Sequence, residues 1–189
     1  MDRREAIIRV AVLLGGAVIG ANAFLSGCKS SAPKGPGLLD KDQLAFLNEI
    51  AEIILPATAT PGAKEADVAP FMNNMVTDCY EPKDQEVFIA GLKKLDEACH
   101  KQQGKQFMDC SPQERTAFLI TLDAEQKKYT SEKKPEDPGH YFRMYKELTL
   151  LGYFTSEAGS TKALRYVAVP GKFEPCIPYK KGEGAWALS

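Results

Sequence analysis

The sequence has few of the side chains and motifs from which active sites and cofactor sites are built. Its only histidines are His100 and His140, and neither stands in a recognised pattern with a serine or cysteine nucleophile. The absence of C-x-x-C and C-x-x-C-H motifs argues against a thioredoxin-like centre, a zinc site and a c-type haem. The phosphate-binding motifs G-x-G-x-x-G and G-x-x-x-x-G-K-S/T are also missing. We therefore expect no catalytic residue, no cofactor-binding residue and no metal ligand in this chain.

The chain also lacks an excess of charge of either sign. Lys and Arg number 24, and Asp and Glu number 25, which gives a formal net charge of −1. A nucleic-acid surface needs a clustered basic excess, so we expect no nucleic-acid partner. A length of 189 residues suffices for one compact domain with a sizeable core, even after removal of an N-terminal signal.

No hydrophobic run is long enough for a convincing membrane span, yet the N-terminus has the pattern of an export signal. The apolar stretch from Val10 to Leu25 covers only about 15 residues and contains several glycines. Arg3 and Arg4 precede it, which is typical of a twin-arginine signal peptide over residues 1–27. A transmembrane anchor and ordinary Sec export remain open alternatives.

The signal ends at a motif for lipid attachment. Residues 25–28, Leu-Ser-Gly-Cys, resemble a bacterial lipobox, in which the thiol of Cys28 carries the lipid. Residues 28–39 are small, polar and rich in Pro and Gly, as expected of a flexible tether. Buried acyl CH₂ groups contribute about 0.8 kcal/mol each, so lipid alone anchors a soluble domain. We expect a periplasmic, lipid-anchored protein, and Lys29 weakly favours the inner face of the outer membrane.

Apolar residues at helical spacing predict an all-α fold for residues 40–189, as a single domain of about five or six amphipathic helices. The predicted helices are one from Asp40 to Pro56, one over 68–79, one from Pro82 to Gly104, one after a capping box at 111–114, one from Tyr141 to Gly152, and a short one within 152–166. Residues 126–139 are predicted to be a charged surface linker. From about residue 167 we expect a long irregular C-terminal arm, because prolines and glycines prevent a long helix there.

Four cysteines follow Cys28, and an even number in an exported chain is compatible with two disulfides. Our pairing hypothesis joins Cys99 to Cys110 and Cys79 to Cys176. Helical spacing places Cys79 and Cys99 on apolar faces, where burial raises the thiol pKa and lowers reactivity. Structural disulfides are therefore favoured over thiol redox chemistry.

Three carboxylates near the first loop are the remaining candidates for acid–base chemistry. Glu49 and Glu52 precede the loop of residues 57–67, and Glu65 lies near its end; paired carboxylates of this kind serve as general acid and base in some enzymes. Solvation on helix faces explains them more simply, so we assign them no catalytic role.

Two longer motifs resemble the gluconate 2-dehydrogenase subunit 3 family. They are ILPATATPGA at residues 54–63 and LTLLGYFTSEAGSTKALRY at residues 148–166, and the resemblance extends over nearly all of residues 40–188. Members of that family are small, exported and cofactor-free, and they bind large FAD-dependent dehydrogenases of the glucose-methanol-choline type that oxidise sugars and sugar acids in the periplasm.

The resemblance implies a non-catalytic small subunit, with FAD in the partner and no cofactor in this chain. A cytochrome c is an open alternative for the electron acceptor, and a lipobox makes a separate anchoring cytochrome less necessary. The twin-arginine pathway moves folded proteins, so the resemblance suggests that a flavin-loaded partner is exported while bound to this subunit. Two rival hypotheses are an autonomous periplasmic thiol-based enzyme and a solitary scaffolding or ligand-binding lipoprotein.

Aromatic residues in and before the arm are the candidates for the partner interface, because aromatics are favoured at interface centres and so small a domain buries them with difficulty. They are Tyr153, Phe154, Tyr166, Phe173, Tyr179 and Trp186. Burial against the domain's own helices is the open alternative for each of them.

Overall fold

The computed structural model describes residues 37–169, 171–172 and 176–187. The predicted signal peptide with Arg3 and Arg4, the predicted lipidation site Cys28 and the interface candidate Phe173 lie outside the described residues. In chain order the elements are α2 (Lys41–Ile54), α3 (Val68–Cys79), α4 (Pro82–Gln103), the 3-10 turn η1 (Phe107–Asp109), α5 (Pro112–Glu132), α6 (Tyr141–Thr155) and the π-helical turn η2 (Gly159–Ala163). This composition confirms the all-α fold.

Local capping chemistry explains where the helices begin and end. The Asp40 side chain accepts a hydrogen bond from the backbone N–H of Gln43 at 2.8 Å, and α2 starts directly after it. Ser111 and Glu114 form the predicted capping box at the start of α5. Gly104 ends α4 with a φ of 72°, a left-handed conformation that favours glycine. These three boundaries agree with the sequence prediction.

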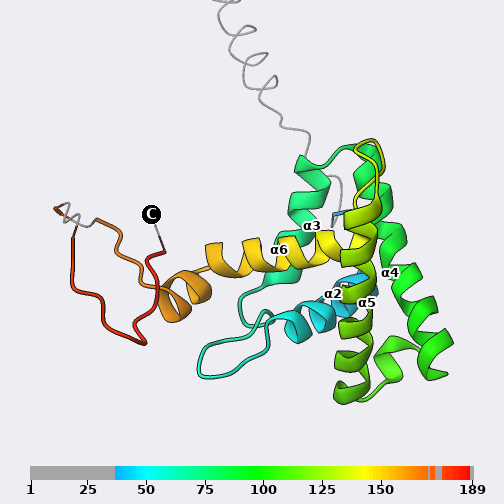
Figure 1. Cartoon of the computed structure of the whole chain (residues 1–189), viewed down its shortest axis with the longest axis horizontal. Coiled ribbons are helices and arrows are strands. Elements are labelled where there is room, and N and C mark those ends of the chain that lie inside the picture. The colour runs from blue at the N-terminus through cyan, green and yellow to red at the C-terminus, as the bar shows by residue number, and fades with distance from the viewer. Residues whose placement is uncertain (1–36, 170, 173–175, 188–189) are drawn as a thin grey trace, which may run out of the picture. The chain divides into compact units, whose positions relative to one another are not determined.

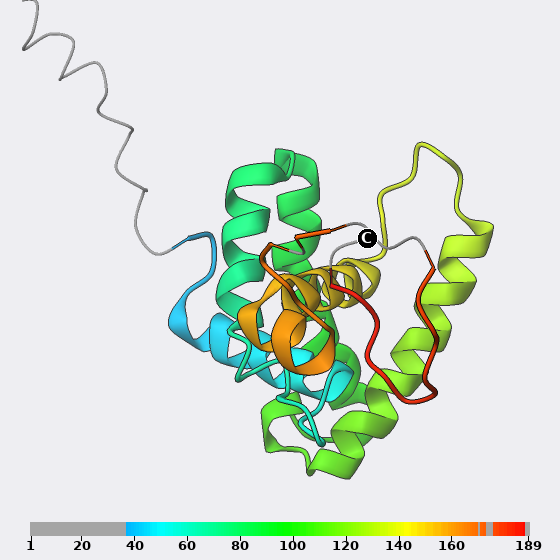
Figure 2. The same cartoon turned by 90° about the vertical axis from the view of Figure 1, so that its left-hand side faces the viewer.

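The helix α6 lies at the centre of the packing and contacts α2, α3, α4 and α5 (Figure 1, Figure 2). Its residue Tyr145 is fully buried, and the phenol O–H donates to the backbone carbonyl of Phe88 on α4 at 2.7 Å. The rings of Phe88 and Tyr145 meet edge to face at 4.8 Å. Gly91 of α4 lies against Tyr141 and Tyr145 of α6, so α4 and α6 approach closely there.

Two predictions about helix length are wrong. The charged segment from residue 126 is helical to Glu132, because Gln126 packs into the core and Asp123 pairs with Lys127 one turn later. The linker is therefore confined to 133–140. Gly152 does not end α6 but lies inside it, buried where a side chain would collide with the Phe71 ring. The helix closes at Ser156, whose N–H donates to the carbonyls of Gly152 and Tyr153.

Two predictions about individual residues also need correction. The tether does not extend to residue 39, because Leu39 is 2% exposed and its N–H donates to the Asn73 side chain on α3 at 3.1 Å. The Cys79 thiol does not face the core: Cys79 is the last residue of α3, and it is exposed although Val76 one turn earlier is buried.

Candidate partner-binding surface

The ILPATATPGA motif forms a loop that one carboxylate organises. Glu52, in the last turn of α2, accepts hydrogen bonds from the backbone N–H of Ala57 at 3.0 Å and of Lys64 at 2.9 Å. Gly62 is buried against this carboxylate, and a Cβ at that position would lie 2.3 Å from a Glu52 oxygen. The Tyr153 O–H of α6 donates to the Pro61 carbonyl at 2.7 Å. Residues 56–59 are exposed but held in place from both ends.

The other two candidate carboxylates are engaged in ion pairs. Glu49 contacts Arg115 of α5 at 3.0 Å and also pairs with Lys64. Glu65 pairs with Lys162 of η2 at 3.2 Å. Each of the three carboxylates therefore has a structural contact: Glu52 binds the loop, Glu49 pairs with α5 and Glu65 pairs with η2. We assign them a structural role.

The described cysteines fall into one close pair and two separate residues. The Sγ atoms of Cys99 and Cys110 are 3.7 Å apart in the core, whereas Cys79 and Cys176 are exposed. All four thiols are free in this structure. Burial, followed by the hydrogen bond with Cys110, raises the pKa of Cys99 to about 12, so its thiol is protonated and unreactive at neutral pH. Both disulfide pairings stay predictions.

The two histidines occupy different environments. His100 is exposed in the last turn of α4. His140 caps α6, because its Nδ1 accepts from the backbone N–H of Phe142 at 3.2 Å, and its ring stacks on Tyr141. Burial is the main cause that lowers the His140 pKa below its usual value. Among the described residues no three His, Cys, Asp or Glu side chains are grouped as metal ligands would be.

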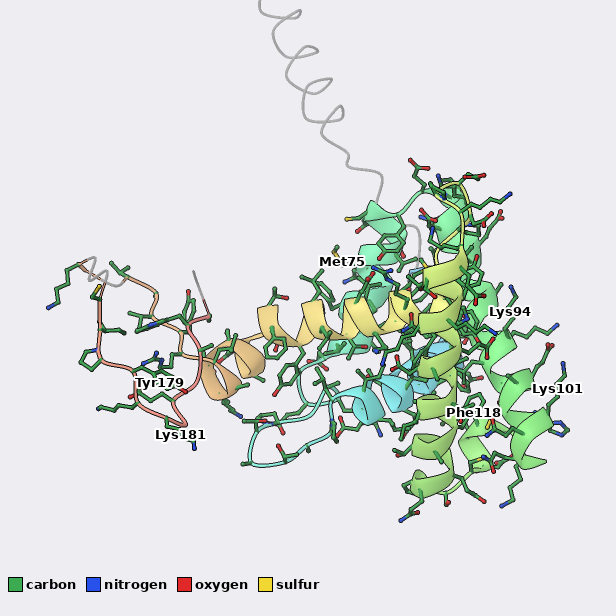
Figure 3. The ribbon with its side chains drawn as sticks, in the orientation of Figure 1. Met75, Lys94, Lys101, Phe118, Tyr179 and Lys181 are labelled. Carbon is green, nitrogen blue, oxygen red and sulfur yellow. The ribbon has the colours of Figure 1, made fainter. Side chains whose placement is uncertain are left out.

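The C-terminal arm, defined here as residues 164–169, 171–172 and 176–187, carries exposed aromatic and apolar side chains. Tyr166 is 47% exposed, Tyr179 82% and Trp186 47%, and Val169 and Ile177 are exposed as well. The arm lies beyond the C-terminal end of α6, at the opposite end of that helix from α4 and α5 (Figure 1). Tyr179 and Lys181 are both on this arm (Figure 3).

The helix α6 contributes to the same kind of surface. Phe154, Leu150 and Leu151 are each at least 40% exposed near its C-terminal end. Tyr153, by contrast, is only 4% exposed and is engaged with Pro61, so its assignment to a partner interface is wrong. Since an α-helix has about 3.6 residues per turn, neighbouring side chains lie on different parts of its circumference, and Tyr153 faces the core while Phe154 faces outward.

The arm is closed on itself by contacts of one arginine, a feature that sequence patterns did not indicate. The Arg165 guanidinium lies 4.3 Å from the centre of the Trp186 ring, and its Nη1 pairs with Glu183 at 3.1 Å. The Arg165 backbone donates to Ala185 and accepts from Ala187, both at 2.8 Å. We call these contacts of Arg165 with residues 183–187 the clasp.

A family model for gluconate 2-dehydrogenase subunit 3 matches residues 41–171. The chain belongs to the gluconate 2-dehydrogenase subunit 3 family. Among curated proteins and among solved structures, no significant match is found. The matched region covers most of the chain, including all five described α-helices, the loop of the ILPATATPGA motif and Arg165. Within residues 37–187 as described, none of the helices combines the length and apolar character needed to cross a bilayer.

Membership of this family makes the chain a subunit of a dehydrogenase. A subunit needs a surface for its partner, and the exposed side chains of the arm and of α6 supply apolar area of the kind that interfaces bury. Sequence reasoning identified four of the described aromatics on this surface but missed Arg165, Leu150 and Leu151. Helical periodicity could have identified the two leucines, because they lie away from the centre of the buried face of α6. It could not have identified the clasp, because the clasp joins residues about 20 positions apart.

Proposed function

We propose that this protein is the non-catalytic small subunit of an FAD-dependent dehydrogenase that oxidises a sugar, sugar acid or polyol in the periplasm. The observation that carries the proposal is the exposed aromatic and apolar surface of the arm and α6, on a chain of a dehydrogenase-subunit family. Interface centres are rich in Tyr, Trp and Phe, and large exposed apolar patches on small domains mark binding sites. The large subunit, which belongs to the glucose-methanol-choline type in this proposal, buries that surface and holds the FAD.

The proposed subunit has two further roles, export and attachment. Its twin-arginine signal carries the folded, flavin-loaded large subunit through the membrane, and its lipidated Cys28 then tethers the complex, with a cytochrome c as the electron acceptor. In this arrangement residues 1–27 are removed. The domain that binds the large subunit then follows a tether beginning at residue 28.

Purification of the native lipoprotein with its partner tests the role as a subunit. We expect a flavoprotein to be recovered with it, and the separated small subunit to be colourless and inactive towards sugars and polyols. A yellow or catalytically active isolated chain would instead favour the autonomous enzyme. Recovery of the lipoprotein without any flavoprotein would favour a solitary scaffold.

Replacement of both signal arginines by lysine tests the export role. Arg3→Lys with Arg4→Lys keeps the charge but removes the twin-arginine pattern, so both subunits should remain in the cytoplasm. Cys28→Ala, the matched variant for attachment, should leave export intact and release the complex from the membrane. If the flavoprotein reaches the periplasm in the lysine variant, the escort hypothesis is wrong.

A further inference from the structure

The arm is long, exposed and closed at its base. All described residues from 166 to 183 are exposed. The clasp brings Arg165 beside residues 183–187, about 20 positions later in the chain. Gly184 fits close to the end of η2, where a Cβ would lie 3.1 Å from the Ala163 carbonyl oxygen. Closing a segment of this length costs conformational entropy, and the contacts of the clasp offset that loss before any partner binds.

The charge of the arm differs from that of the helical domain. Residues 40–163 contain 15 Lys and Arg against 21 Asp and Glu, whereas residues 164–187 contain four against two. Lys180 and Lys181 are exposed beside Tyr179. A partner surface complementary to this arm is therefore apolar at its centre and acidic at its edge.

We propose that the clasp of Arg165 and Trp186 holds the C-terminal arm in a preformed shape that docks its apolar side chains onto an acidic-edged site of the dehydrogenase large subunit. This inference rests on the proposed function. It adds which segment of the chain binds the large subunit and which contacts order that segment before binding. Arg165 is a positioning residue in this arrangement. A segment ordered before binding loses less entropy on association, so pre-ordering strengthens binding without new contacts.

The membrane is the competing occupant, because exposed aromatic residues beside lysines also suit a lipid surface. The family assignment favours the large subunit, since a dehydrogenase subunit must bury part of its own surface in the complex. The helix α6, which precedes the arm in the chain, also exposes apolar side chains, namely Leu150, Leu151 and Phe154. A protein partner is able to cover both.

A double-mutant cycle tests the clasp. Arg165→Gln, Trp186→Leu and the double variant are compared for the rates of association with, and dissociation from, the purified flavoprotein recovered with the native protein. We expect each single variant to weaken binding about tenfold, which is about 1.4 kcal/mol, mainly through slower association. The double variant should be no weaker than the singles, because one structural unit is lost only once. Trp186→Phe, which keeps an aromatic face for the guanidinium, should recover most of the affinity.

The controls separate docking from folding and from direct contact. Tyr179→Ser on the arm should add its own loss to that of Trp186→Leu, whereas Ile120→Ser, at a 67% exposed position on α5, should change nothing. Thermal midpoints should be unchanged throughout. Losses that multiply to about a hundredfold in the clasp double variant would mean independent contacts and would overturn the clasp.

The remaining outcomes distinguish this inference from the proposed function. If the wild-type protein binds the flavoprotein and all arm variants bind equally well, the docking role of the arm is wrong and the proposed function stands. If the wild-type protein binds no flavoprotein, both are wrong. If the arm variants keep the complex but lose binding to vesicles of anionic phospholipid, the arm is a membrane contact and the inference is overturned.

Discussion

Replacing Glu52 by glutamine tests whether one carboxylate organises the ILPATATPGA loop. Glu52→Gln keeps the size of the side chain but leaves one oxygen where two now accept hydrogen bonds, from Ala57 at 3.0 Å and Lys64 at 2.9 Å. The new amide N–H₂ then faces a backbone N–H donor. Hydrogen bonds to a charged group contribute about 1.5–3 kcal/mol, so we expect the free energy of unfolding to fall by about 2 kcal/mol.

Urea unfolding of Glu52→Gln gives that free energy, and hydrogen exchange gives its location. Exchange should accelerate at the amides of Ala57 and Lys64 and remain slow in the buried part of α6. Glu65→Gln is the matched control, because the same chemical change removes only an exposed ion pair and should cost less than about 1 kcal/mol. Equal losses in the two variants, or unchanged exchange in the loop, would show that Glu52 does not order it.

Three further predictions concern packing, oxidation and pH. Gly91→Ala should destabilise the fold by about 1–3 kcal/mol in thermal or urea unfolding, since the new Cβ would lie 2.5 Å from the Tyr141 Cβ; unchanged stability would contradict the close approach of α4 and α6. Oxidation should join Cys99 to Cys110 in a disulfide that closes a loop of 11 positions, so reductant should then lower the free energy of unfolding by about 3 kcal/mol. Peptide mapping that finds both thiols free after export would refute the pairing. Burial lowers the His140 pKa below 6.5, so the unfolded chain binds the proton more readily and stability should fall as pH drops below about 6.5; His140→Asn, which keeps a capping acceptor, should remove that part of the pH dependence.

Most helix boundaries were predictable because their causes are local. The Asp40 cap, the Ser111–Glu114 capping box and Gly104 each act within a few residues of the boundary they set. The failures came where distant contacts outweighed local preference. Gly152 is an ordinary helix-ending signal, yet Phe71 of α3 packs against it and α6 continues for three more residues.

The candidate interface residues also divide into those that local sequence predicted and those that depend on distant contacts. Composition predicted that aromatics of the arm are hard to bury, and Tyr166, Tyr179 and Trp186 are indeed exposed. Tyr153 and Phe154 are neighbours in one apolar motif, and the pattern alone did not distinguish the buried residue from the exposed one. That distinction depends on the Pro61 carbonyl, which accepts from the Tyr153 O–H across 92 positions of sequence.

The order of residues along this chain was enough to establish a helical domain, its caps and its family, because helix periodicity, capping and motif spacing are properties of short segments. Long-range folding established the rest. Glu52 became the organiser of a loop through contacts between segments that local patterns do not relate. The sequence suggested the pairing of Cys99 with Cys110 as a hypothesis, and the fold places their Sγ atoms 3.7 Å apart in the core. The clasp between Arg165 and Trp186 has the same origin, because the geometry of a guanidinium over an indole ring exists only once the chain has turned back on itself.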